Sequence, residues 1–221
     1  MTKGTDKSLM SLFPLSGIVL FPGMNLPLHI FEEKYKKMIS ECIENDKRFG
    51  IVLAKGKQCA EIGTAALIVS VEKLEEGKMN IFTEGKERFR ILEIVKKEPY
   101  MKAYIEKYDD LDSEIDTNLK QKIKEIRKLS AKALNIYDKV AEQELSKKLK
   151  LPDEPNKLMF LIAANLTCPH DVKQHILEVQ SVKKRADKIL DLLKDEIQRL
   201  EVLLENKKTK NDVVKNGKLK I

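Results

Sequence analysis

The chain has 221 residues, a formal net charge of +7, 35% charged residues and 42% hydrophobic residues. This composition is typical of a soluble globular protein with a highly charged surface, and the length suits one large domain or two small ones. No apolar run approaches the roughly 18–20 residues of a membrane span, and the N-terminal MTKGTDKSLM lacks the apolar core of a signal peptide. We therefore expect a cytoplasmic protein with no membrane partner.

The cysteines and the C-terminus refine this expectation. Cys42, Cys59 and Cys168 are scattered and include no CxxC pair, which argues against a disulfide framework and for a reducing compartment. Residues 206–221 hold six Lys and one Asp, which leaves a net charge of only +2 for the rest of the chain. A Lys-rich terminus of this kind is typical of a solvated, disordered tail, and less often of an arm that binds nucleic acid.

The first apolar region, Leu12 to Ile30, is interrupted by prolines and glycines. Because proline cannot donate to a strand ladder, the region predicts short strands near Ile18–Leu20 and Leu26–Ile30. Phe21-Pro22-Gly23 between them predicts a turn, since proline fixes φ and glycine accepts a positive φ. A strand that turns a corner in a small barrel has this pattern.

The next region changes period. Apolar residues after Phe31 recur at helical spacing and predict a helix, with Glu32 and Glu33 in its first turn. The helical set is Tyr35, Met38, Ile39, Cys42 and Ile43. RFGIVLA, at 48–54, then predicts a buried strand.

From Ile62 to Tyr108 the apolar residues alternate, as in β-strands. The sequence EEGK predicts a turn, the Glu93/Ile94 pair predicts a bulge, and Glu98-Pro99 separates the last two runs. Several such runs with short turns indicate a compact barrel or sandwich.

After an acidic, turn-rich stretch the pattern is helical to the end, including a long amphipathic helix over about 181–205. We therefore predict an α+β fold in which a β-barrel with one early helix is followed by a C-terminal α-helical bundle. The predicted boundaries are 1–8 for an N-terminal extension, 9–109 for the barrel, 110–118 for a linker, 119–205 for the helical subdomain and 206–221 for the basic tail.

The run LFPLSGIVLFPGMNLPLHIFEEKYKKMI resembles the start of the N-terminal, substrate-recognition domain of Lon proteases, in particular of free-standing bacterial LON-domain proteins. FGIVLA, IGTAALI, EGKERFRI, EPYMKAYIE and the helical HILEVQSVKKRADKILDLL follow in the family's order. The resemblance covers about residues 9–205. It implies a PUA-like β-barrel followed by helices, and a domain that recognises polypeptide substrates.

The sequence shows no sign of catalysis. The nearest approach to a phosphate-binding loop, Gly50 with Gly56-Lys57, has the wrong spacing, and Gln58 replaces the required hydroxyl. The Ser-Lys peptidase segment of Lon proteases is not found. His170 and His175 are five apart, whereas a zinc pair on a helix needs a spacing of four. We expect no enzyme activity, no cofactor and no metal site.

The remaining interpretation is a polypeptide-binding module in protein quality control. It would recognise unfolded or client segments and hand them to a protease or chaperone, with strand edges and apolar pockets as the binding features. The candidate binding residues are Pro22, His29, Phe31, Tyr35, Arg88 and Tyr100.

Two alternatives stay open. PUA-like folds also serve in RNA binding, although nucleic acid is expected here only through weak contacts of the basic tail. The long C-terminal helix would suit an adaptor that assembles with itself, and the sequence does not give the oligomeric state.

Overall fold

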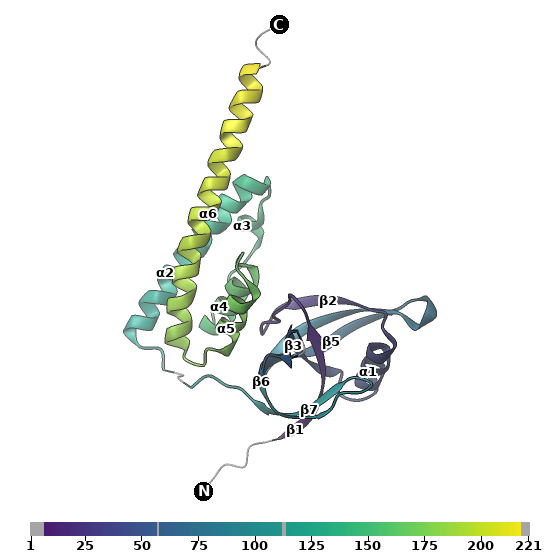
Figure 1. Ribbon diagram of the computed structural model, residues 1–221. Coiled ribbons are helices and arrows are strands. Elements are labelled where there is room, and N and C mark those ends of the chain that lie inside the picture. Colours follow the sequence, from purple (N-terminus) through teal and green to yellow (C-terminus); the bar gives the residue numbers. More distant parts are fainter. Residues whose placement is uncertain (1–6, 57, 112–113, 218–221) are drawn as a thin grey trace. The chain divides into compact units, whose positions relative to one another are not determined.

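The computed structural model describes residues 7–56, 58–111 and 114–217 (Figure 1). They fall into two units, each of which is described by itself. The first unit contains the described residues of Met1–Asp112 together with Ala163–Ser181, and the second contains those of Ser113–Ile162 and Val182–Ile221.

Seven strands build the first unit. They are β1 (Ser8–Leu15), β2 (Asn25–Ile30), β3 (Arg48–Lys55), β4 (Gln58–Cys59), β5 (Ile62–Lys73), β6 (Met79–Lys96) and β7 (Met101–Lys107). The pairing order β1-β7-β6-β5-β3 closes on itself because β1 also pairs with β3, in parallel. β4 and β2 are attached to β3 and β6, respectively. The predicted β-barrel with an early helix, and with it the α+β class, is confirmed.

β2 and the first part of β6 extend the barrel as a three-stranded arm with the second part of β5 (Figure 1). The inner face of the arm packs on α1 (Glu33–Glu44), which confirms the predicted helix. The residues that meet there are Leu26 and Ile30 of β2, Ile68 of β5, Met79 and Ile81 of β6, and Met38 and Ile39 of α1.

The first strand differs from the prediction. Ile18–Leu20 is not a strand, and the paired residues are instead those of β1. Leu20 is buried, but its carbonyl oxygen accepts a hydrogen bond from the side chain of Thr64 at 2.6 Å rather than from a neighbouring strand. Apolar burial alone therefore did not distinguish a strand from a buried loop at this position.

The predicted turn at Pro22 is confirmed. The amide of Met24 donates to the carbonyl of Phe21 at 3.0 Å, and Gly23 has a φ of +78°. The turn lies directly on β6, where Gly85 exchanges two backbone hydrogen bonds of 2.8 Å with Gly23 and Met24. A Cβ atom on Gly85 would lie 2.2 Å from the carbonyl oxygen of Phe21, so only glycine allows this approach.

The first unit also contains α5 (His170–Glu178). The side chain of Gln174 donates to the carbonyl of Ile62 at 2.9 Å, which fixes the helix against β5. The contacts thus group 163–181 with the β-strands, whereas the sequence placed this segment in a helical subdomain of 119–205. α4 (Pro155–Asn165) contains the change from one unit to the other.

The second unit is built on α2 (Thr117–Ala141), the short α3 (Leu145–Lys148) and α6 (Val182–Gly217). Three ion pairs join α2, or the residue directly after it, to α6: Lys122–Asp187, Lys132–Glu201 and Glu142–Lys207. From one pair to the next, both partners lie further toward the C-terminus of their helices. The two long helices are therefore parallel. Ile136, Ile197 and Leu200 form the centre of their contact.

α6 runs past the predicted end of the long helix at Glu205. Residues 206–217, predicted as disordered tail, are helical, and 218–221 lie outside the described residues. Lys207 gives a local reason, because its ammonium donates to the carbonyl of Val140 at 2.9 Å and pairs with Glu142 at the C-terminal end of α2. A cation at a helix C-terminus is stabilised by the helix dipole.

Candidate functional site: the outer face of the β2–β6–β5 arm

The outer face of the three-stranded arm carries exposed side chains in cross-strand rows. Because side chains alternate along a strand, burial of Leu26, Ile81 and Ile68 on the inner face turns their neighbours outward. Pro27 of β2 pairs with Phe82 of β6, and Phe82 pairs with Ser70 of β5. In the next row, His29 pairs with Asn80, and Asn80 pairs with Glu72. We call these two rows, together with Val69 and Phe31, the outer face.

The first row is apolar. Phe82 is 39% exposed and Val69 is 56% exposed, and Pro27 is also exposed. The register shifts between Ile68 and Ser70, so Val69 is the extra residue of a bulge opposite Phe82. Three adjacent strands therefore present apolar side chains to solvent at one level of the arm.

The second row is polar and connected. Nδ1 of His29 lies 2.8 Å from Oδ1 of Asn80, whose Nδ2 donates to Glu72 at 2.8 Å. The imidazole also stacks on the ring of Phe31, with centroids 5.8 Å apart and 25° between the planes. Phe31, directly after β2, is 58% exposed. The sequence-predicted His29 and Phe31 are thus brought together, and the hydrogen bond with Asn80 orients the imidazole.

β2 also has a free edge. It pairs with β6 along one side, and no other strand within 7–56, 58–111 and 114–217 pairs with it. An edge strand exposes backbone donors and acceptors to which an extended peptide can be added as a further strand. Pro27 removes one donor from β2, which shortens the stretch that is available for pairing.

The other predicted residues lie elsewhere in the first unit. Pro22 is half-buried in the turn before β2. Tyr35 is half-buried, and its ring packs 4.0 Å from that of Phe13, on the core side of α1. Neither side chain belongs to the outer face.

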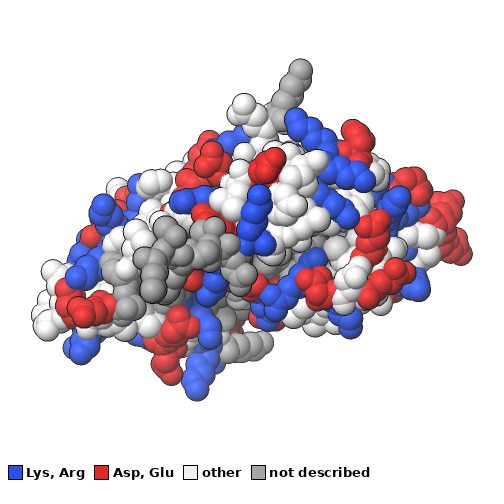
Figure 2. Space-filling model, turned by 90° about the horizontal axis from the view of Figure 1, so that it is seen from below, with Lys and Arg blue, Asp and Glu red and all other residues white. Residues whose placement is uncertain are grey.

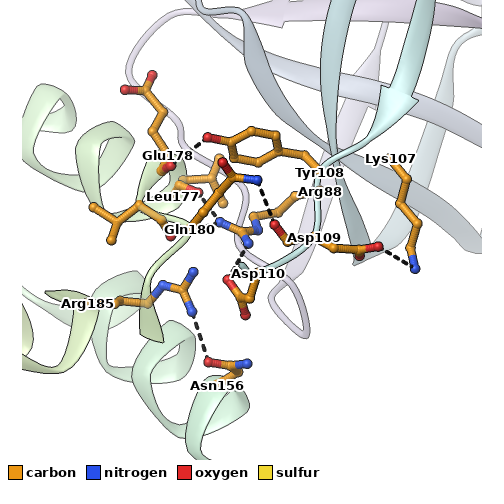
Figure 3. A network of polar contacts seen from close by, with 11 residues as sticks. Arg88, Lys107, Tyr108, Asp109, Asp110, Asn156, Leu177, Glu178, Gln180 and Arg185 are labelled. Carbon is orange, nitrogen blue, oxygen red and sulfur yellow. Dashed lines mark hydrogen bonds and ion pairs between the residues drawn. The ribbon is translucent and has the colours of Figure 1, made fainter. Parts of the chain in front are cut away.

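Arg88 lies in the interior of the first unit (Figure 3). Its guanidinium pairs with Asp110 at 2.6 Å and donates to the carbonyl oxygens of Leu177, at 2.6 Å, and Val179, at 3.2 Å. Its side chain is 4% exposed. Next to it, Tyr108 donates to the carbonyl of Glu178 at 2.9 Å. The network joins β6 and the segment after β7 to the C-terminal end of α5, so Arg88 positions chain segments and does not face solvent.

Tyr100 is also buried, at 4% exposure. Its hydroxyl donates to the Glu41 carboxylate on α1, and the ammonium of Lys102 lies 3.3 Å from the same carboxylate. The hydrogen bond from Tyr100 lowers the pKa of Glu41, and burial raises the pKa of Tyr100. These three side chains fasten α1 to β7, away from the rows of the outer face.

Sequence reasoning missed Phe82, Val69, Asn80 and Glu72. A signal was available for two of them, because an alternation that places Ile81 and Thr83 on one face of a strand turns Asn80 and Phe82 to the other. The bulge at Val69 had no such signal. Among the described residues there is no group of three His, Cys, Asp or Glu side chains placed to hold a metal ion.

Comparison with known proteins agrees with this architecture. A model of the ATP-dependent protease La (LON) substrate-binding domain matches residues 10–195. The Lon protease of Anaeromyxobacter dehalogenans (strain 2CP-C) is 28% identical over 196 residues, which are 84% of this chain and 23% of that protein. The Lon protease of Cytophaga hutchinsonii is 26% identical over 211 residues, which are 91% of this chain and 26% of that protein. The chain thus spans about a quarter of the length of these relatives.

Solved structures show the same fold. The N-terminal domain of the Mycobacterium avium complex Lon protease aligns with a TM-score of 0.67 and 17% identity, over 85% of this chain and 99% of that one. A Lon N-terminal domain protein from Xanthomonas campestris aligns with a TM-score of 0.64 and 19% identity, over 83% and 98%. Since the family model covers residues 10–195, the chain belongs to the LON substrate-binding domain family.

Proposed function

We propose that the chain is a non-catalytic polypeptide-binding module that takes up unfolded or client segments on its outer face. The observation that carries the proposal is the exposed row of Pro27, Phe82 and Val69 beside the free edge of β2. An apolar surface favours segments whose apolar side chains have lost their own core. An open strand edge accepts the backbone of such segments largely regardless of sequence.

Family membership supports the same function, because the matched domain is described as substrate-binding. We extend this description to the present chain as part of the proposal. A bound client would be passed to a protease or chaperone, as in protein quality control. The cytoplasm is the proposed location; Cys42, Cys59 and Cys168 form no disulfide, in keeping with a reducing compartment. None of the described helices is long and apolar enough to span a membrane.

The proposal is tested by titrating the purified chain into fluorescein-labelled, reduced and carboxymethylated α-lactalbumin, which stays unfolded, and measuring anisotropy. We expect saturable binding in the micromolar range. Replacing both Phe31 and Phe82 by Ser should weaken binding about tenfold or more, because two large apolar contacts are lost.

The matched control is Val202→Ser, which removes a 51% exposed apolar side chain from α6. It should bind like the unchanged protein. Circular dichroism verifies that all variants are folded. Absence of binding at tens of micromolar, or equal weakening by Val202→Ser, contradicts the proposal.

RNA binding is the second candidate function. In the view of Figure 2, basic and acidic side chains are interspersed, and that face has no continuous basic surface among the described residues. Lys207, in the basic stretch, already contacts the end of α2. A filter assay decides the matter: binding to a labelled RNA that survives deletion of 206–221 would favour this reading, and binding that disappears would indicate nonspecific attraction.

A further inference from the structure

The second row of the outer face presents one hydrogen-bonding group of defined character. Because Nδ2 of Asn80 donates to Glu72, the amide oxygen Oδ1 faces Nδ1 of His29. A carbonyl oxygen only accepts, so Nδ1 must carry the proton. The neutral imidazole then has its lone pair on Nε2, and this atom has no hydrogen-bond partner among the described residues. The group offered to a ligand is therefore an acceptor.

This imidazole is positioned although it lies at the surface. Asn80 fixes one edge of the ring, Glu72 fixes Asn80, and Phe31 covers one side of the ring. Ordering exposed side chains costs conformational entropy, and a binding site benefits when this cost is met before the ligand arrives. The connected row is thus a preorganised polar element beside an apolar one.

The row is also negatively charged. Glu72 accepts from Asn80 but has no cationic partner in the part of the chain that the structure describes. Nearby carboxylates differ, because Glu84 pairs with Lys86 at 2.6 Å and Glu76 pairs with Lys78 at 2.6 Å. Lys73 pairs in register with the buried Met79, so it belongs to the opposite face. Glu72 is therefore an unneutralised carboxylate at the edge of the outer face.

We propose that the outer face selects extended segments in which an apolar residue is followed or preceded, two positions away, by Lys or Arg. The apolar side chain covers Phe82 and Pro27, while the cation pairs with Glu72. Nε2 of His29, on the side of the ring away from Asn80, accepts a hydrogen bond from another donor of the same segment. The two rows are two residues apart on each strand, as in Pro27 to His29 and Asn80 to Phe82. In an extended ligand, residues i and i+2 lie on the same side about 7 Å apart, which matches this separation.

This inference rests on the proposed polypeptide-binding function and adds a preference for charge and spacing to it. It is tested with four fluorescein-labelled peptides of eleven residues in a Gly/Ser host, measured by anisotropy at low salt. One carries Phe and Lys two apart, the second has Glu in place of Lys, the third has Phe and Lys three apart, and the fourth has Ser in place of Phe.

We expect the first peptide to bind about three- to fivefold more tightly than the second or third, as for a partly exposed ion pair, and the fourth to bind most weakly. The preference for Lys over Glu should shrink in 0.5 M salt. Glu72→Gln should remove this preference while leaving the dependence on Phe. The matched control Glu87→Gln, an exposed carboxylate paired with Arg48, should keep it.

Asn80→Leu tests the positioning of His29. It should reduce the preference for the two-residue spacing, because the imidazole then rotates freely, while circular dichroism stays unchanged. Equal binding of the first three peptides, alongside binding of unfolded α-lactalbumin, overturns the inference and leaves the proposed function intact. Failure of all peptides and of α-lactalbumin overturns both.

Discussion

Single residues fix the position of β2, the strand that contributes Pro27 and His29 to the outer face. No strand among the described residues pairs with the chain between β1 and β2, so side-chain and backbone hydrogen bonds to its neighbours replace a ladder. Thr64 donates to the carbonyl of Leu20 at 2.6 Å, and Thr83 donates to that of Leu26 at 2.8 Å. Both hydroxyls are buried, and a buried polar group is costly unless it is hydrogen-bonded. The position of β2, and hence of His29, depends on this small set of contacts.

Gly85 is the most sensitive of these positions. Gly85→Ala should lower the free energy of unfolding by about 2–3 kcal/mol, because the new Cβ meets the backbone of Phe21, which cannot rotate away. Urea denaturation followed by circular dichroism measures the change. Ser70→Ala, on the exposed part of β5, is the control and should stay within about 0.5 kcal/mol. Equal stability of the two variants would show that the turn is less firmly seated than the geometry indicates.

Tyr100 gives a prediction about pH. Its hydrogen bond lowers the pKa of Glu41, so the stabilisation is present above the ordinary pKa of the carboxyl and is lost as the pH falls through the lowered value. Tyr100→Phe should therefore cost about 0.5–1 kcal/mol near pH 6, a modest value because Glu41 is partly solvated. The difference between the two proteins should vanish towards pH 3 in urea titrations at each pH. A difference that persists in acid would place its origin in packing.

At the scale of elements, the long periodic segments were predictable and the contacts between distant segments were not. α1, β3 and the bulge in the last part of β6 follow from apolar spacing that is local in the sequence. Arg88 lies in a charged stretch of sequence, which is typical of a surface residue. Its burial could not be predicted, because its partner Asp110 and the carbonyl oxygens of Leu177 and Val179 lie far along the chain. Of the residues of the outer face, the sequence analysis names His29 and Phe31, whereas Val69 can be recognised only from the register of β5 and β6.

The buried Arg88 network should stabilise the position of α5. Arg88→Met should cost about 3 kcal/mol, because the ion pair of the guanidinium with Asp110 and its hydrogen bonds to two carbonyl oxygens are lost inside the unit. Arg88→Lys should recover only part of this loss, since an ammonium lacks the fork of the guanidinium. Hydrogen exchange of the α5 amides should accelerate in parallel with the loss of stability.

Arg90→Met is the matched control, because Arg90 lies on the same strand, is 42% exposed and is 3.6 Å from Glu106. Its cost should stay near zero. If Arg88→Met is no more costly than Arg90→Met, the network has little structural value. If folded Arg88→Lys protein binds unfolded α-lactalbumin more weakly, the sequence-based assignment of Arg88 to polypeptide binding regains support.

At the scale of the whole molecule, the chain combines two units that differ in architecture. The first closes a sheet through non-local pairing and carries the outer face, while the second is a parallel pair of long helices with its own apolar contact. The chain enters the second unit, returns to the first for 163–181 and enters the second again. The change from alternating to helical apolar spacing predicts strands before helices, but this return depends on contacts of α5 that no local pattern encodes.

Because the outer face lies in the first unit, a substitution in the core of the second unit should change stability without changing binding. Ile197→Ala removes a buried side chain from the α2–α6 contact and should cost about 2–4 kcal/mol, seen as an earlier loss of the helical circular dichroism signal at 222 nm. Below that transition its affinity for unfolded α-lactalbumin should match that of the unchanged chain. Phe82→Ser should behave in the opposite way, with weaker binding and little change in unfolding, because Phe82 is partly solvated already. If Ile197→Ala weakens binding as strongly as Phe82→Ser while still folded, the client is held by the helices as well, and the outer face is only part of the site.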